Sequence, residues 1–379
     1  MREAFLLSDK DKIMKQDRIV FLDYLRVAAC LMVMAIHVAE CFYLGGEAPD
    51  VTYVASRRDA IWVTLAECLC RACVPLFVIA SSYLLFPVSR PTGEFLKRRL
   101  VRVFVPFAGW AVAYVVAAGG DLRKLAFNFP DEGGHLWFVP MLFGLYLAMP
   151  LFSPWAEKVG KRELSLWILL WFVTTTFPFL RRLWGETFGT PSFGAVPYLW
   201  GECPWNQFGA FHYVSGFLGY MLIGLWMRKF GGEFTLRKTL PIAAPLWLAG
   251  AAIIGLPFFG TMEACGFPLS RPYSFAVRME MSIEYNSIGV ALSAVAAFLV
   301  LRPIDLQGAF YRSIIRPVSE ASYGMYLMHM FILPHAVLAF RPHLPVPLCI
   351  LFASLATFIA SAFVAVAVRR IPKLGKWLC

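Results

Sequence analysis

Residues 19–44 read IVFLDYLRVAACLMVMAIHVAECFYL, and this stretch decides the fold class of the chain. An α-helix that crosses a bilayer needs about 20 predominantly apolar residues, which this run supplies. It is longer than the apolar region of a cleavable signal peptide, carries Asp23 and Arg26, and is followed by no small-residue cleavage pattern. We therefore expect it to persist as the first membrane-spanning helix.

Further apolar runs follow along the chain, and 59% of the 379 residues are hydrophobic whereas 16% are charged. This composition excludes a soluble domain of this length and predicts an all-α polytopic bundle of about ten transmembrane helices. The expected spans are 19–44, 60–86, 101–118, 135–152, 165–180, 213–227, 240–259, 282–301, 321–340 and 346–368. No compositional break divides the chain, which indicates one membrane domain.

The distribution of lysine and arginine predicts the orientation of the bundle. With the N-terminus in the cytoplasm, the inner segments hold 24 of the 35 Lys and Arg residues and the outer segments hold 9. We therefore expect both termini to be cytoplasmic, with tails at 1–18 and 371–379 around a membrane domain at 19–370. Topology and contact with membrane lipid account for the net charge of +11, so no nucleic-acid partner is expected.

Four ionisable side chains share one face of the first span. On a helical wheel with Arg26 at zero, His37 falls at about 20°. Asp23 falls at about 60° and Glu40 at about −40° on the same wheel. A charge at mid-bilayer costs on the order of 2.5 to 3.5 kcal/mol, so this stripe is expected to face a wet interior. The structural alternative is a set of two ion pairs, Asp23 with Arg26 and His37 with Glu40.

His37 is the expected catalytic residue of the stripe. Imidazole is the group there that exchanges a proton near neutral pH when unperturbed, which suits a general base or a nucleophile. Glu40, one turn further along, is expected to fix the imidazole tautomer and to stabilise the imidazolium. On the second span Glu67 and Arg71 form an i, i+4 pair that we interpret as structural.

The sequence KRRLVR at 97–102 ends an expected cytoplasmic loop over 87–102. Arg99 and Arg102 are i, i+3 neighbours, and with Lys97 they are expected to hold the phosphates of a nucleotide-containing donor. A positive-inside anchor is the simpler function of the same charges. The sequence contains no zinc motif, P-loop or Gly-x-Ser-x-Gly elbow, and no metal is expected.

The motifs and their order resemble the membrane-bound acyltransferase-3 family over about residues 17–370. The resemblance rests on FLDYLR at 21–26 with a histidine after ten intervening residues, KRRLVRVFVP at 97–106, GGHLWFVPMLFGLYLAMPLF at 133–152 and SYGMYLMH at 322–329. Members carry acyl groups, usually acetyl, from cytoplasmic acyl-CoA to hydroxyls of glycans or lipid-linked sugars. The resemblance implies an O-acyltransferase of the inner (plasma) membrane that works beside polysaccharide biosynthesis proteins.

The resemblance also assigns roles by position. Arg26 and His37 match the motif of the first helix, and Arg99 and Arg102 match the arginine pair of the loop. The expected donor-binding residues are thus Arg26, Lys97, Arg99 and Arg102, with acetyl-CoA or another acyl-CoA as donor. The expected substrate-binding residues are Trp137, Tyr326 and His329, from the fourth span and the late helix.

Other functions remain open at this point. A transporter or flippase for a polysaccharide or lipid-linked sugar would use the stripe to relay protons. A membrane scaffold would tolerate the loss of its charges. For an enzyme, general-base catalysis and an acyl-histidine intermediate are both compatible with His37.

Overall fold

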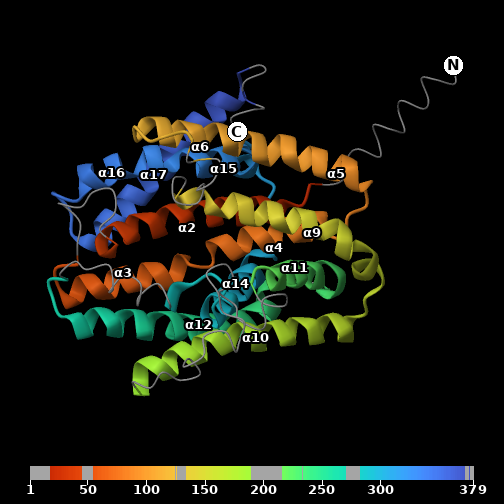
Figure 1. Ribbon diagram of the computed structural model, residues 1–379, viewed down its shortest axis with the longest axis horizontal. Helices are drawn as coiled ribbons and strands as arrows, with labels where there is room; N and C mark the ends of the chain where they lie inside the picture. The colour runs from red at the N-terminus through yellow and green to blue at the C-terminus, as the bar shows by residue number, and fades with distance from the viewer. Residues whose placement is uncertain are drawn as a thin grey trace.

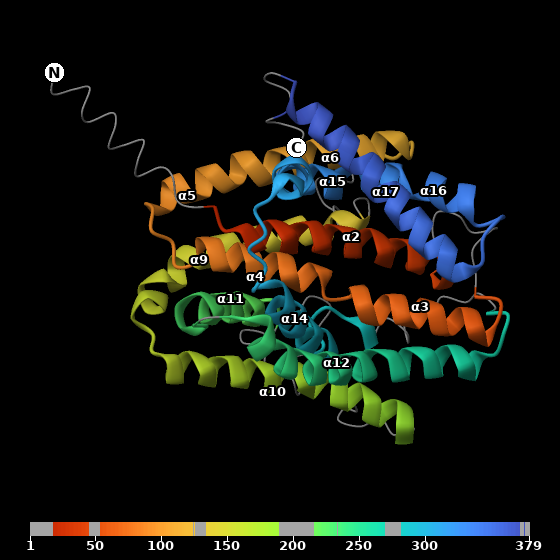
Figure 2. The same cartoon turned by 180° about the vertical axis from the view of Figure 1, so that it is seen from behind.

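The computed structural model describes residues 18–44, 54–123, 125, 134–188, 216–232, 234–269, 282–371 and 375. Within these residues every regular element is a helix, which confirms the all-α prediction. The longer helices run side by side along the long axis of the molecule (Figure 1). Both views place α10 and α12 on one face and α5, α6 and α17 on the opposite face (Figure 2).

The α-helices are α2 (Val20–Tyr43), α3 (Arg57–Cys70), α4 (Cys73–Leu85), α5 (Thr92–Arg99), α6 (Val105–Ala117), α9 (Phe138–Lys158), α10 (Lys161–Phe188), α11 (Leu218–Phe230), α12 (Leu236–Cys265), α14 (Ile288–Leu301), α15 (Arg316–Met328), α16 (Leu333–Phe340) and α17 (Val346–Arg369). Short 3-10 helices cover Gly134–Trp137 (η2) and His329–Phe331 (η5), and π-helical turns cover Leu100–Phe104 (η1) and Tyr311–Ile315 (η4). Each of the ten expected spans overlaps at least one of these helices, and 60–86 and 321–340 each overlap two α-helices.

Within the described residues, six continuous segments are long and apolar enough to cross a membrane, at 20–43, 57–85, 92–117, 134–158, 236–265 and 346–369. A seventh, 311–340, bends by 58° at the break between η5 and α16. Helix α14 is apolar but has only 14 residues. The described helices thus support a multi-pass membrane protein, and the number ten remains a prediction.

The basic sequence at 97–102 lies inside a helix, so the expected loop over 87–102 is too long at its C-terminal end. Helix α5, the turn η1 and α6 form one segment over 92–117. Lysine, arginine and leucine are good helix formers, and no proline occurs between Pro91 and Pro106 to interrupt them. The third span therefore begins with its charged residues already in helical geometry.

The start of α2 and the end of α17 lie at the same end of the bundle. Glu320 of α15 accepts a hydrogen bond from Arg18 at 2.5 Å and pairs with Arg369 at 3.6 Å. Burial lowers the pKa of Arg18, but the bonds and charges of Asp23 and Glu320 outweigh it and raise that pKa well above its usual value. Arg18 therefore stays charged. That this end faces the cytoplasm remains a prediction.

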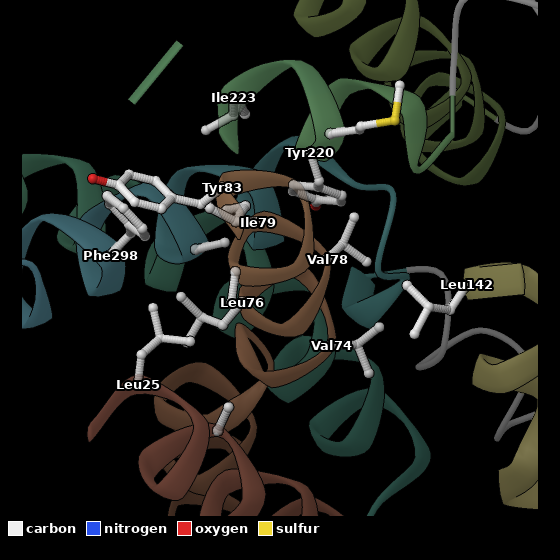
Figure 3. Close-up of a cluster of buried hydrophobic side chains, with 14 of the residues drawn as sticks. Leu25, Val74, Leu76, Val78, Ile79, Tyr83, Leu142, Tyr220, Ile223 and Phe298 are labelled. Carbon is white, nitrogen blue, oxygen red and sulfur yellow. The ribbon is translucent and has the colours of Figure 1, made fainter. Parts of the chain in front are cut away.

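Helix α4 packs at the centre of the largest apolar core (Figure 3). Its side chains meet those of α2, α9, α11 and α14, represented in Figure 3 by Leu25, Leu142, Tyr220, Ile223 and Phe298. Gly224 allows α11 to approach α4, because a Cβ there would lie 2.7 Å from the carbonyl oxygen of Ile79. This core fixes α4 beside α2, and with it the break between α3 and α4.

Candidate active site

Interruptions in three helices place polar side chains around α2. Arg71 lies in the break between α3 and α4, and His135 lies in η2 just before α9. His329 begins η5, which ends at the bend before α16, and Pro334 follows in α16, where it supplies no backbone N–H. Irregular backbone at membrane depth is tolerated where it is buried in protein or lines a cavity. Polar residues at these positions are therefore candidates for the functional site.

His37 is held by Glu40 on the same helix. The imidazole Nδ1 lies 2.6 Å from the carboxylate Oε2, and both side chains are 18% exposed. A carboxylate can only accept, so Nδ1 carries the hydrogen. We infer that the neutral imidazole presents the lone pair of Nε2 to a ligand. This is the imidazole–carboxylate pair that the helical spacing predicted.

Arg71 extends this pair into a buried network. Its Nη1 donates to Glu40 at 3.0 Å and to Glu67 at 3.3 Å. Its Nε donates to the carbonyl oxygen of Ile283 at 2.7 Å, and the ring of Tyr285 lies 4.4 Å from the guanidinium carbon. The i, i+4 pair with Glu67 is present as predicted, yet the same guanidinium also fixes the carboxylate that orients His37.

Three histidines gather beside this network. The ring centre of His37 lies 5.2 Å from that of His329 and 6.4 Å from that of His135, and the last two are 5.1 Å apart. His329 is fully buried, and its Nδ1 lies 2.6 Å from the carbonyl oxygen of Tyr326. That carbonyl is in the last turn of α15, where backbone acceptors have no partner within the helix. The hydroxyl of Tyr326 donates to the carbonyl oxygen of His135 at 2.6 Å, which ties the late helix to η2.

The helical wheel places Asp23 on the same face of α2 as Arg26, His37 and Glu40, but in the structure its carboxylate is buried against other helices. Its carboxylate accepts hydrogen bonds from Arg18 at 2.6 Å, Ser319 at 2.6 Å and Tyr311 at 2.7 Å, and its side chain is 2% exposed. Arg26 is 3.8 Å from this carboxylate and remains 31% exposed. Asp23 thus ties α2 to α15 and η4, whereas Arg26 makes only the longer contact to this carboxylate and keeps part of its side chain exposed.

Arg99 of the third span lies near Tyr146, which is also near Arg26. Its guanidinium carbon lies 5.7 Å from the ring centres of Phe95 and Tyr146, and its Nε is buried without a hydrogen-bond partner. Tyr146 of α9 is also close enough to Arg26 to interact with it electrostatically. Both arginines therefore lie near the same tyrosine of α9.

The model of the Acyl_transf_3 family, described as an acyltransferase domain, matches residues 19–368. The chain belongs to the acyltransferase-3 family. Comparisons with curated proteins and with solved structures give no match. Membership of the family makes this chain a membrane acyltransferase. The matched region contains His37, the network around Arg71, and the basic residues Arg26 and Arg99.

The remaining predicted residues of the acyltransferase fall in different places. Lys97 and Arg102 are exposed. The π-helical turn that begins at Leu100 changes the number of residues per turn, so Arg102 does not share the half-buried position of Arg99. Trp137 packs on Tyr285 with ring centres 5.5 Å apart, and the same tyrosine ring contacts the guanidinium of Arg71. The binding roles of these residues remain predictions.

His135 and Arg71 are the residues of this site to which the sequence assigned no function. His135 precedes Trp137 in the motif GGHLW, but its position in a 3-10 turn is not visible in a helical wheel. The i, i+4 spacing of Glu67 and Arg71 already accounts for the charge of Arg71. The contact of Arg71 with Glu40, 31 residues away in the sequence, has no such local signal. That the face of α2 from Arg26 to His37 lines a wet interior also remains a prediction.

Proposed function

We propose that the protein is an O-acyltransferase of the inner membrane. It moves an acyl group, acetyl as the first candidate, from cytoplasmic acyl-CoA to a hydroxyl of a cell-surface glycan or lipid-linked sugar. The observation that carries this proposal is the series His37–Glu40–Arg71, in which a carboxylate held by an arginine orients an imidazole inside an acyltransferase domain. A carboxylate that orients an imidazole in this way is the arrangement of acyl-transfer triads.

Arg26 and Arg99 are the proposed contacts for the phosphates of acyl-CoA. The planar guanidinium matches the geometry of phosphate and can make two parallel hydrogen bonds to it. The unpartnered Nε of Arg99 and the partial exposure of Arg26 support this assignment. Lys97 and Arg102 are exposed on the same span and add positive charge that attracts the anionic donor.

His37 is the proposed catalytic residue. As general base, Nε2 takes the proton of the acceptor hydroxyl while the oxygen attacks the thioester carbonyl; the C–S bond then breaks and the proton passes to the sulfur of the departing CoA. As nucleophile, the same nitrogen first attacks the thioester carbonyl, the C–S bond breaks and CoA leaves as the thiolate. The hydroxyl then attacks the acyl group, its proton passes to the thiolate, and the C–N bond breaks to free Nε2. Both routes need the lone pair on Nε2 that the bond from Nδ1 to Glu40 leaves available.

Radiolabelled acetyl-CoA supplied to inside-out vesicles tests the proposal. We expect label on glycan with the wild-type protein, and turnover lower by roughly 10² to 10⁴ in His37→Ala if the residue is a general base. His343→Ala, which changes an exposed histidine, is the matched control and keeps the wild-type rate. Near wild-type transfer in a folded His37→Ala protein contradicts the mechanism. A transporter or a scaffold leaves the glycan unlabelled in every variant.

A further inference from the structure

Two imidazole nitrogens beside His37 are buried without a partner. They are the Nε2 atoms of His135 and His329. Native proteins rarely leave a buried polar atom unpaired, because the loss of its bonds to water is not repaid. These atoms lie in neighbouring rings, 5.1 Å apart between centres, so one ligand can meet both.

The hydrogen-bond partners of the rings define what such a ligand must offer. The carbonyl oxygen of Tyr326 can only accept, so Nδ1 of His329 carries the hydrogen and Nε2 is an acceptor. Nε2 of His37 is an acceptor for the same reason, because Nδ1 faces Glu40. Two acceptors cannot bond to each other, although their rings are only 5.2 Å apart.

A single hydroxyl cannot satisfy both acceptors. It carries one hydrogen, which goes to one Nε2 and leaves the other unpaired. The thioester group of acyl-CoA carries no O–H or N–H at all. Within the described residues, no three His, Cys, Asp or Glu side chains are placed to hold a metal ion that would occupy these nitrogens. A second hydrogen, from another donor close to the reacting hydroxyl, would satisfy the other nitrogen.

We propose that the acceptor carries two neighbouring hydroxyls, a vicinal diol. His37 takes the proton of the hydroxyl that is acylated, and Nε2 of His329 accepts a hydrogen bond from the adjacent one. This inference rests on the proposed function and makes His329 a residue that determines specificity for the acceptor.

The test compares two small acceptors that differ by one hydroxyl, trans-cyclohexane-1,2-diol and cyclohexanol. The full chain is purified in lipid nanodiscs and given labelled acetyl-CoA with each probe. We expect kcat/KM for the diol to exceed that for the mono-alcohol by roughly tenfold or more, because a site that hydrogen-bonds a hydroxyl discriminates against the analogue lacking it. A diol used no better than cyclohexanol, including no transfer to either, overturns the proposal.

Variants assign the preference to His329. In His329→Phe the ratio of the two kcat/KM values is expected to fall towards one. His329→Gln, whose amide oxygen still accepts a hydrogen bond, is expected to retain part of the ratio. A ratio that survives both substitutions overturns the role of His329, and His343→Ala serves as the control. Label transferred to vesicle glycan by the wild type shows that the proposed function stands even where the diol preference is absent.

Discussion

Arg71 donates a hydrogen bond to Glu40 across 3.0 Å, and this contact joins a break in the second span to the helix that carries His37. Neither residue reaches the imidazole Nε2 on which the chemistry depends. Glu40 acts through Nδ1 and Arg71 acts through Glu40, so both are positioning residues for the proposed reaction. Their positions inside the bundle also make them costly to change one at a time.

Replacing Arg71 by methionine leaves Glu40 and Glu67 buried without their cation. Because breaking a buried ion pair costs roughly 3 to 5 kcal/mol, we expect a marked fall in the melting temperature. We also expect kcat to fall while KM for acyl-CoA changes little. The double variant Arg71→Met, Glu40→Gln is expected to be less impaired than the sum of the single changes, as measured by a double-mutant cycle. Additive effects would show that the two side chains are not coupled.

Glu40→Gln isolates the charge of the carboxylate. The amide oxygen can still accept from Nδ1 of His37, but it cannot stabilise the imidazolium. We expect turnover at saturating acetyl-CoA to fall by roughly 10²-fold or more, in line with the loss of the carboxylate from other imidazole pairs. Glu94→Gln changes an exposed carboxylate and is the control. Wild-type turnover in Glu40→Gln would remove Glu40 from the site.

Arg26→Ala and Arg99→Ala are expected to raise KM for acetyl-CoA more than they lower kcat. The reason is that phosphate contacts remote from the thioester bind the donor without taking part in the chemical step. The effect should largely vanish with acetyl-pantetheine, which carries no phosphate. Arg98→Ala is the matched control, because Arg98 is paired with Glu94 at 2.8 Å. An equal loss with both donors would contradict phosphate binding.

Asp23→Asn tests the structural role of the first acidic residue in α2. Its carboxylate holds Arg18, Tyr311 and Ser319, and hydrogen bonds to a charged group contribute about 1.5 to 3 kcal/mol each. We expect a lower melting temperature and a nearly unchanged KM for acetyl-CoA. A rise in KM without a change in stability would instead place Asp23 in the donor site.

The sequence predicts those parts of the molecule that depend on local spacing. The apolar runs identify the helices, because a helix that crosses lipid is recognised by the length and the apolar composition of its segment alone. The His37–Glu40 pair follows from two positions on one uninterrupted helix. A helical wheel fails at Arg71, which lies between two helices, and at His135 and His329, which lie in 3-10 turns where the angle per residue is not that of an α-helix. The contact between His37 and His329 depends on how separate helices pack, which spacing along the chain does not specify.

The late position of His329 in the chain has a consequence for biosynthesis. His37 and His135 emerge from the ribosome long before the segment that contains His329, and α15 must be made and inserted before the third imidazole can lie beside the other two. An incomplete chain thus holds its first two histidines without the third. The acceptor contact proposed for His329 is therefore acquired only near the end of translation, once the late helices have reached the bilayer.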